Sequence, residues 1–386
     1  MQSNDRRPLL ALTLGDPAGV GPEIVARTAA SPEILSICRP LAIGCPAVLR
    51  EVARLSGVPA EIVALETPDD AVRLARSDDP RHAQSPDRIL CLAAGPQFRC
   101  VDFPDIDTNI QHVPSPSAAD ILRAGRLDAR CGEAAFCAVK LAAQMAIDHR
   151  IDGLVTAPLH KEALHLAGHD YPGHTELLAE MCGVRDYAMM LYLGPDEIVR
   201  SPHGLAVVHV TLHTAMRNVF HEMTPEVIRE KTELVHHFMQ RMGCRKPRIA
   251  ICALNCHNGE GGLFGDEERT MIAPAVTACQ AVGLHVTGPL SVDTIFVHAR
   301  DGRYDAVVAM YHDQGHIALK LIGMHHAVNI TLGLPIVRTS VAHGTAMEIA
   351  WKKTASQREG EASDPNGGVQ ISSMIEAIRC AARLAQ

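Results

Sequence analysis

Short apolar runs alternate along this chain with longer segments in which apolar residues recur every three or four positions. The run Leu9–Leu14 precedes the amphipathic segment Pro22–Ala30, and Gly153–Thr156 precedes Lys161–Ala167 in the same way. Short runs of strand-forming residues followed by amphipathic helices are typical of helices packed on a mostly parallel sheet. The sequence therefore predicts an α/β fold.

The same pattern predicts further elements along the rest of the chain. Strands are expected at Leu41–Gly44, Ala188–Tyr192, Leu205–His209, Arg248–Leu254, Leu284–Thr287 and Ala306–Met310, and helices at Ala47–Leu55, Cys131–Ile147, Pro225–Met242, Glu267–Val282 and Ile371–Leu384. Residues 66–116 are rich in Asp, Pro, Arg and Ser, and we expect a loop-rich insertion there. Residues 356–368 are similarly polar. A chain of 386 residues favours two lobes.

Composition narrows the classes of function. Lys and Arg number 36 against 44 Asp and Glu, which gives a net charge of −8, and aromatic residues make up 3%. This charge has the wrong sign for covering nucleic-acid phosphates, and few rings are available to stack on bases. No uncharged apolar run approaches the roughly 20 residues that cross a bilayer. With 12 cysteines in no repeated spacing, we expect a cytoplasmic protein with free thiols that binds neither nucleic acid nor membrane.

A glycine-rich segment, GDPAGVGPE at residues 15–23, lies between the first predicted strand and helix. Its glycine spacing does not match the dinucleotide fingerprint, and it lacks the Lys-Ser/Thr of a phosphate-binding loop. Taken alone, it is best interpreted as a tight strand-to-helix turn.

Histidine is unusually abundant, with 21 copies, and three of them follow or end predicted strands. These are His213, His257 and His312. Because the carboxyl ends of strands line one crevice in an open α/β sheet, the three imidazoles can converge there. They would form a metal site with a position open for a substrate oxygen. A single histidine at such a place is more often structural, and Cys252, Cys256 and His257 offer a less favoured alternative, a structural zinc site.

A second group of residues is cationic or polar. It contains Lys161, His174 with Thr175, Lys320 and Arg338. In an acidic protein, a basic cluster beside a crevice would attract a phosphate or carboxylate. Lys320 and Arg338 lie among apolar residues, where an unpaired charge is costly, so they are the less ordinary members of the group.

With these residues assembled, the sequence resembles the 4-hydroxythreonine-4-phosphate dehydrogenase family. The matching motifs are GDPAGVGPE at 15–23, APLHKE at 157–162, GHTE at 173–176, LNCHNGEGGLFG at 254–265, MYHDQGHIALK at 310–320 and NITLGLPIVRTSV at 329–341. The resemblance implies a two-lobed fold like that of isocitrate and isopropylmalate dehydrogenases, with the active site in the interlobe cleft. It also implies a homodimer with its sites at the subunit interface. We expect residues 1–150 and 320–386 to form the outer lobe with cofactor-binding elements, and residues 151–319 the central lobe with the metal site and dimer interface.

The resemblance assigns roles to individual residues. It implies a divalent metal ion (Zn, Co, Ni or Mg) on His213, His257 and His312, substrate contacts from His174, Thr175, Lys320, Asn329 and Arg338, and NAD or NADP at His343, Gly344 and Thr345. Lys161 is our candidate for moving the proton, with Asp293 and Asp313 orienting groups around the metal. The sequence departs from the family at Ala342, where Asp is common, and at Cys256 and Asn258, where Pro and Ala are common.

Members of the family oxidise the C3 hydroxyl of a four-carbon hydroxy acid phosphorylated at C4, and the product then loses carbon dioxide. An alternative is the branch acting on D-threonate or D-erythronate 4-phosphate, because His160-Lys161-Glu162 and the glycine-rich segment are typical of it too. A third branch dehydrogenates dihydrodiol dicarboxylates. From other classes, a metal-dependent hydrolase or lyase and a non-enzymatic binding module remain open.

Overall fold

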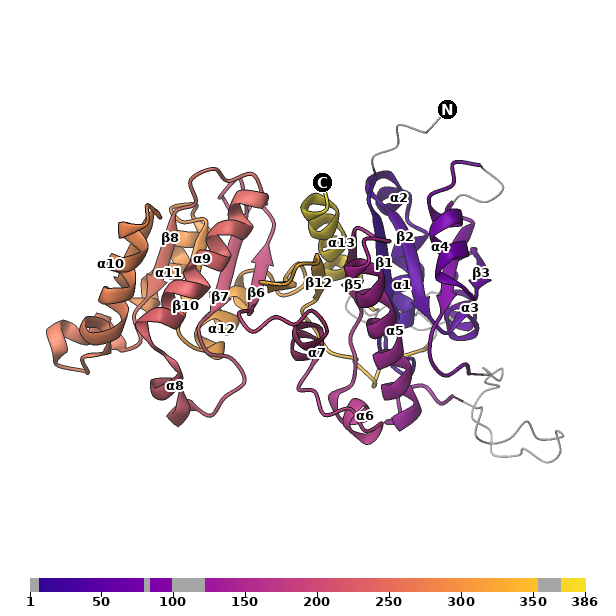
Figure 1. Cartoon of the computed structure of the whole chain (residues 1–386), viewed down its shortest axis with the longest axis horizontal. Helices are drawn as coiled ribbons and strands as arrows, with labels where there is room; N and C mark the ends of the chain where they lie inside the picture. The colour runs from indigo at the N-terminus through magenta and orange to yellow at the C-terminus, as the bar shows by residue number, and fades with distance from the viewer. Residues whose placement is uncertain (1–6, 80–83, 99–121, 353–368) are drawn as a thin grey trace, which may run out of the picture. The chain divides into compact units, whose positions relative to one another are not determined.

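The computed structural model describes residues 7–79, 84–98, 122–352 and 369–386 (Figure 1). The chain divides into two units. Unit 1 comprises Met1–Met181 and Ile336–Gln386, and unit 2 comprises Cys182–Pro335. Within the described residues, each unit contributes six strands and has buried apolar residues of its own.

The strands of unit 1 are parallel to one another and mostly buried. In order across the sheet these are β3 (Glu61–Leu65), β4 (Arg88–Ala93), β2 (Arg39–Gly44), β1 (Leu9–Thr13), β5 (Gly153–Thr156) and β12 (Arg338–Val341). Leu12 in β1 pairs with Ala42 on one side and Val155 on the other. Strands buried on both faces require near-continuous apolar runs, and β1 and β2 are buried along their whole length.

Helices cover the sheet of unit 1 in two groups. One group, whose members contact one another, contains α1 (Gly21–Ala29), α2 (Pro32–Ile37), α3 (Pro46–Leu55) and α13 (Ser372–Leu384). The other group contains α5 (Ala129–Ile147), which packs against β1, β2 and β5 and contacts α6 (Lys161–Leu166) and α7 (His174–Met181). A further helix, α4 (Pro68–Ala75), packs on β4 and β2. Alanine-rich α5 buries small side chains, which lets α6 lie so close that a Cβ on Gly132 would be 2.0 Å from the Ala163 carbonyl oxygen.

Unit 2 has a mixed sheet. Its strands, in order, are β11 (Val328–Leu332), β6 (Ala188–Leu193), β7 (Leu205–His209), β10 (Ala306–Ala309), β8 (Ile249–Cys252) and β9 (Val286–Leu290). Strand β6 is antiparallel to both β11 and β7, whereas β7, β10, β8 and β9 are parallel. The parallel strands therefore end at a common edge of the sheet.

The helices of unit 2 place residues at that edge. They are α8 (Met216–Glu222), α9 (Pro225–Arg241), α10 (Ala273–Ala281), α11 (Val292–Arg300) and α12 (His312–Gly323), with the short helical segments Cys256–Gly262 and Glu268–Ile272. Helices α9 and α12 both pack on β7 and β10. Because α12 starts three residues after β10 ends, His312 lies at the carboxyl end of this strand.

The predicted α/β fold is confirmed, but two expectations about its layout differ from the structure. Residues 66–79 and 84–98 are not loop throughout, because α4 and β4 lie there; residues 80–83, 99–116 and 356–368 lie outside the described ranges. The units divide after residues 181 and 335 rather than at 150 and 319, because β5 pairs with β1 and with β12 in unit 1. In the described parts, none of the helices is both long and apolar enough to cross a membrane.

Candidate active site

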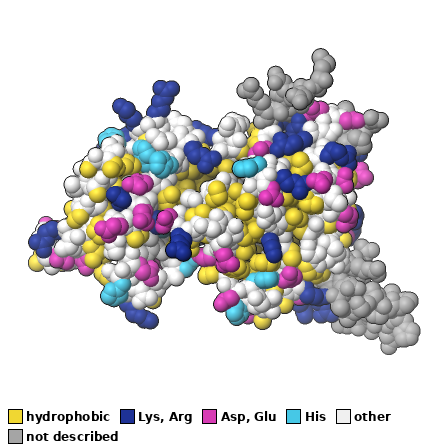
Figure 2. Space-filling view, viewed as in Figure 1, with side chains coloured by type: hydrophobic (Ala, Val, Ile, Leu, Met, Phe, Trp, Pro, Cys, Tyr) yellow, Lys and Arg dark blue, Asp and Glu magenta, His cyan; other side chains and the backbone are white. Residues whose placement is uncertain are grey.

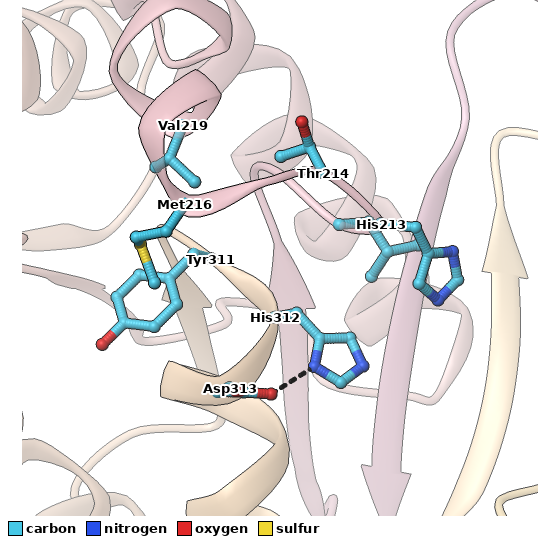
Figure 3. A pocket seen from close by; sticks show the side chains of 8 residues that line it. His213, Thr214, Met216, Val219, Tyr311, His312 and Asp313 are labelled. Atoms are coloured by element: carbon cyan, nitrogen blue, oxygen red, sulfur yellow. Dashed lines mark hydrogen bonds and ion pairs between the residues drawn. The ribbon is translucent and has the colours of Figure 1, made fainter.

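Two of the three histidines predicted to bind metal line one pocket of unit 2. The pocket has a volume of about 420 Å³, and His213, beyond the end of β7, and His312, at the start of α12, both line it (Figure 3). Their ring centroids are 5.8 Å apart. Asp313 Oδ1 accepts a hydrogen bond from His312 Nδ1 at 2.7 Å. With its proton on Nδ1, His312 has an unprotonated Nε2, which is the form of imidazole nitrogen that can bind a metal.

His257 lines a neighbouring pocket of about 310 Å³, together with Asp293. Tyr311 borders both pockets. In the segment that carries His257, five consecutive residues from His257 to Gly261 have positive φ, which non-glycine residues rarely adopt. Glu268 stabilises the start of this segment, because its Oε1 accepts the backbone N–H groups of Leu254 at 2.8 Å and of Asn255 at 2.7 Å. Burial opposes ionisation of Glu268, but these hydrogen bonds keep its pKa below the ordinary value.

Two of the three candidate histidines lie close enough together to bind one divalent metal ion, but a third ligand does not join them within the described residues. Two imidazoles bound to one ion at ordinary metal–nitrogen distances have ring centroids within about 6.5 Å, a limit that His213 and His312 meet. Within the ranges that the structure describes, however, His, Cys, Asp and Glu side chains do not form a group of three that could hold an ion. Cys252, Cys256 and His257, the alternative zinc ligands, therefore do not form such a group either. Cys252 is buried in β8, and burial raises the pKa of its thiol.

Two further histidines, His209 and His316, lie next to His312. The His316 ring stacks on the His312 ring, with centroids 3.7 Å apart and planes 12° apart. His316 Nδ1 lies 3.0 Å from His209 Nε2, and His209 Nδ1 lies 3.3 Å from the Met189 carbonyl oxygen. Burial lowers the pKa of His209 to about 4 and that of His316 to about 2, so both rings are neutral at pH 7.

Lys320 and Asn329, predicted to bind substrate, also belong to unit 2. Lys320 lies two helical turns after His312 on α12 and is partly exposed. Asn329 pairs with Leu191 between β11 and β6. Its buried Oδ1 accepts no hydrogen bond from the residues described.

Arg338 is a buried cationic group of unit 1. Its side chain is 2% exposed at the start of β12, and Nη2 donates to Thr156 Oγ1 at 2.9 Å. Burial lowers the pKa of Arg338 to about 10, and the Glu176 carboxylate opposes that shift. Burial, and then the charge of Arg338, hold the pKa of His174 well below its usual value. His174 Nε2 has no hydrogen-bond partner among the described residues. Buried Thr175 follows on α7.

Lys161 lies beside this cluster, at the first position of α6. His160 caps the helix, its Nδ1 accepting the Ala163 N–H at 3.4 Å. The Lys161 side chain is exposed, and its Cε lies 3.9 Å from the place a Cβ would occupy on Gly173. Lys161 therefore reaches the segment that contains His174.

The segment predicted to bind a cofactor packs against the glycine-rich turn. The Thr345 carbonyl oxygen accepts the Val20 N–H at 3.0 Å, and a Cβ on Gly19 would lie 2.9 Å from the same oxygen. Gly344 is exposed, with open space around it, and His343 is partly exposed. Gly15 turns with φ +67°, and a Cβ there would be 2.2 Å from the Pro158 carbonyl oxygen, so the predicted strand-to-helix turn is present.

Comparison with known proteins identifies the family. A sequence model described as "Pyridoxal phosphate biosynthetic protein PdxA" matches residues 36–363. This chain belongs to the PdxA family. A D-threonate 4-phosphate dehydrogenase from Pectobacterium atrosepticum is 41% identical over 344 residues, which cover 89% of this chain and 93% of that protein. A 4-hydroxythreonine-4-phosphate dehydrogenase from Geobacter metallireducens is 40% identical over 357 residues, or 92% and 94% of the two chains.

Solved structures agree with this assignment. The crystal structure of 4-hydroxythreonine-4-phosphate dehydrogenase from Klebsiella pneumoniae matches with a TM-score of 0.73 and 39% identity over 100% of each chain. The resemblance to the PdxA family inferred from the motifs is therefore confirmed, and the chain is an enzyme of a dehydrogenase family.

Sequence reasoning missed several residues around the site. His316 stands four residues after His312, a spacing that puts both on one face of a helix, but without a predicted helix there the signal was not visible. His209, the last residue of a correctly predicted strand, gave no such signal. Glu176 and Thr156, which surround Arg338, are visible only once the strands and α7 are placed.

Proposed function

We propose that this enzyme oxidises the C3 hydroxyl of a four-carbon hydroxy acid phosphorylated at C4, with NAD or NADP as the hydride acceptor, and that the oxidised product is decarboxylated. The observation that carries the proposal is the enclosed Arg338 guanidinium beside a neutral His174. A buried cation in a protein of net charge −8 favours an anionic ligand. The PdxA relatives described above are named for phosphorylated substrates.

Unit 1 would hold the phosphate group. The Arg338 guanidinium supplies charge, while His174 and Thr175 supply a neutral ring and a hydroxyl next to it. The face shown in Figure 2 carries acidic and basic side chains interspersed, so surface charge alone does not create a phosphate site on that face. In unit 2, the Lys320 ammonium and the Asn329 amide would contact the carboxylate and hydroxyl groups of the substrate.

His213, His257 and His312 would hold a divalent cation, which would supply electrostatic stabilisation of negative charge on the reacting oxygen. The nicotinamide would supply the hydride acceptor, with its adenosine part near the exposed Gly344. Asp313 keeps the proton of His312 on Nδ1, and Asp293, which lines the pocket of His257, would orient groups there. Lys161 Nζ would accept the hydroxyl proton.

The enzyme would act as a homodimer. One protomer places two of the three candidate imidazoles in the same pocket, and the family resemblance implies sites at a subunit interface. Ile317 and Leu321 on α12 are 59% and 83% exposed, and Met324, directly after the helix, is 53% exposed; together they form an apolar stripe along the helix that carries His312. A second copy covering this stripe could supply the missing ligand.

A second candidate substrate has equal support from the comparisons. The D-threonate 4-phosphate dehydrogenase relative is as similar to this chain as the 4-hydroxythreonine-4-phosphate dehydrogenase relative. Both substrates carry the phosphate that Arg338 favours, whereas dihydrodiol dicarboxylates do not. A hydrolase or lyase using the same histidines would not need a nicotinamide.

The test is a substrate panel monitored by formation of reduced nicotinamide. The purified enzyme receives Zn²⁺, Co²⁺, Ni²⁺ or Mg²⁺ and NAD or NADP with 4-phosphohydroxythreonine, D-threonate 4-phosphate, D-erythronate 4-phosphate or a dihydrodiol dicarboxylate. We expect turnover of at least one phosphorylated acid. Arg338→Met should raise KM for that acid by about 100-fold, because a charge-assisted contact is lost. Turnover of the dihydrodiol alone, or of no substrate with either nicotinamide, would refute the proposal.

A further inference from the structure

One face of α12 carries three polar groups spaced four residues apart. These are His312, His316 and Lys320. His316 is 6% exposed, and its ring covers one face of His312. The buried His316 thus lies between a candidate metal ligand and a candidate substrate-binding cation.

The hydrogen bonds around His316 have one direction. His209 Nδ1 faces the Met189 carbonyl oxygen at 3.3 Å, so this nitrogen carries the proton of the neutral ring. His209 Nε2 is then an acceptor, and His316 Nδ1, 3.0 Å away, must donate to it. The His312 carbonyl oxygen, 3.2 Å from the same His316 nitrogen, is a second acceptor.

The backbone is shaped to allow this arrangement. A Cβ on Gly315 would lie 2.5 Å from His209 Nε2 and 2.8 Å from Val207 Cγ1. Glycine therefore lets α12 approach β7 closely enough for the two imidazoles to meet. His209 is 2% exposed, so both members of the pair are enclosed by unit 2.

We propose that His209 and His316 are positioning residues that fix the ring of His312 for metal binding. Asp313 holds the edge of that ring, and His316 holds its face, with His209 fixing the tautomer and rotation of His316. Outer groups that orient metal ligands typically change metal affinity 10- to 100-fold. This inference rests on the proposed metal site and adds two residues to it.

The experiment measures Co²⁺ binding rather than turnover. The visible absorption of the Co²⁺-loaded protein reports ligand geometry, and competition with a chromophoric chelator gives the affinity. We expect His316→Leu to weaken Co²⁺ binding about 10-fold or more and to change the absorption spectrum. His316→Phe keeps a ring on His312 but loses the hydrogen bond to His209, so its loss should be smaller.

The partner variants test whether the two histidines act as one unit. His209→Leu should weaken Co²⁺ binding, whereas His209→Gln, whose amide oxygen can accept the His316 proton, should restore most of the affinity. The double variant His209→Leu/His316→Leu should bind Co²⁺ no more weakly than the worse single variant, because both substitutions remove the same support. His237→Leu, on an exposed position of α9, is the matched control and should bind like the wild type.

Two results would overturn the inference. One is a folded His316→Leu protein with wild-type Co²⁺ affinity and spectrum; the other is additive loss in the double variant. A role in stability alone would lower the melting temperature and leave the spectrum unchanged. If His213→Ala and His312→Ala abolish Co²⁺ binding while His316→Leu does not affect it, only this inference fails. If the wild type binds no Co²⁺, the proposed metal site fails with it.

Discussion

Asp16 is a carboxylic acid enclosed in the turn between β1 and α1. Its Oδ1 accepts the Ala18 N–H at 2.8 Å, and its buried Oδ2 has no hydrogen-bond partner among the described residues. Burial, with a smaller contribution from the nearby Asp128 carboxylate, raises the pKa of Asp16 from 3.8 to about 6. The folded protein therefore holds a proton there that the unfolded chain has already released at pH 5.

This shift predicts a pH-dependent effect of Asp16→Asn. Because the pKa is higher in the folded state, stability is lost as pH rises from about 4 to about 6, and the loss reaches at most about 3 kcal/mol. Asn keeps an acceptor for Ala18 and does not ionise. The melting temperature of the variant, relative to wild type, should rise between pH 4 and pH 6 and then level off. A difference that is constant over this range would contradict the assignment.

Lys161 is the residue whose role is least constrained by geometry, and substitution can define it. Lys161→Ala should lower kcat about 100-fold or more, with metal content unchanged, if the amine accepts the hydroxyl proton. Lys161→Arg keeps the charge but does not release its proton, so it should be equally slow. Lys246→Ala, an exposed lysine of unit 2, is the control. Equal loss of activity and metal, or rescue by Arg, would indicate a structural or purely electrostatic role.

At the scale of single elements, the segment carrying His257 depends on one carboxylate. Glu268 accepts hydrogen bonds from Leu254 N, Asn255 N and Asn255 Nδ2, the last at 3.0 Å. Glu268→Ala leaves two backbone N–H groups without that acceptor, so unfolding free energy should fall by about 2 to 4 kcal/mol. Amide hydrogen exchange at residues 254 and 255 should accelerate.

Glu267→Ala provides the matched comparison. Among the described residues this carboxylate accepts a hydrogen bond from the Asn255 side chain alone, at 2.6 Å, and its loss should cost about 1 kcal/mol without exposing the backbone. Unchanged exchange at residues 254 and 255 in Glu268→Ala, measured by mass spectrometry, would show that other contacts hold the segment.

The elements also show what the sequence pattern can and cannot predict. Strands β5 and β7 were predicted with the observed bounds, because each is a continuous apolar run buried on both faces. Helix α4 was missed, although Thr67 caps it by accepting the Asp70 N–H and Pro68 follows, which is an ordinary helix start. Its charged first turn resembled a surface loop. Helix α12 was missed because Gly315 is a poor helix former. Glycine is needed at this position because it lets the helix approach β7 closely.

At the scale of the whole molecule, sequence reasoning reached the family and the candidate ligands but not their grouping. The positions of His213, His257 and His312 beyond parallel strands place them at one edge of the sheet of unit 2. Whether imidazoles meet within one chain or between two depends on the rotation of side chains and on the association of subunits, which spacing does not encode. The exposed apolar stripe of α12 lies on the helix that carries His312, so it links the association of subunits to the grouping of the imidazoles.

This link predicts that dimer formation and metal binding are coupled. Leu321, 83% exposed, would lie in the subunit interface, so Leu321→Glu would bury a charge there and favour the monomer. If one imidazole comes from the second subunit, the monomer should bind Co²⁺ about 10-fold more weakly or worse, and removing metal with a chelator should weaken the wild-type dimer, because linkage is reciprocal. Sedimentation velocity with and without chelator measures both effects. Val282, directly after α10, is 61% exposed, and Val282→Glu is the control, which should remain dimeric. A monomeric Leu321→Glu protein that retains wild-type Co²⁺ affinity would show that a single chain assembles the complete ligand set.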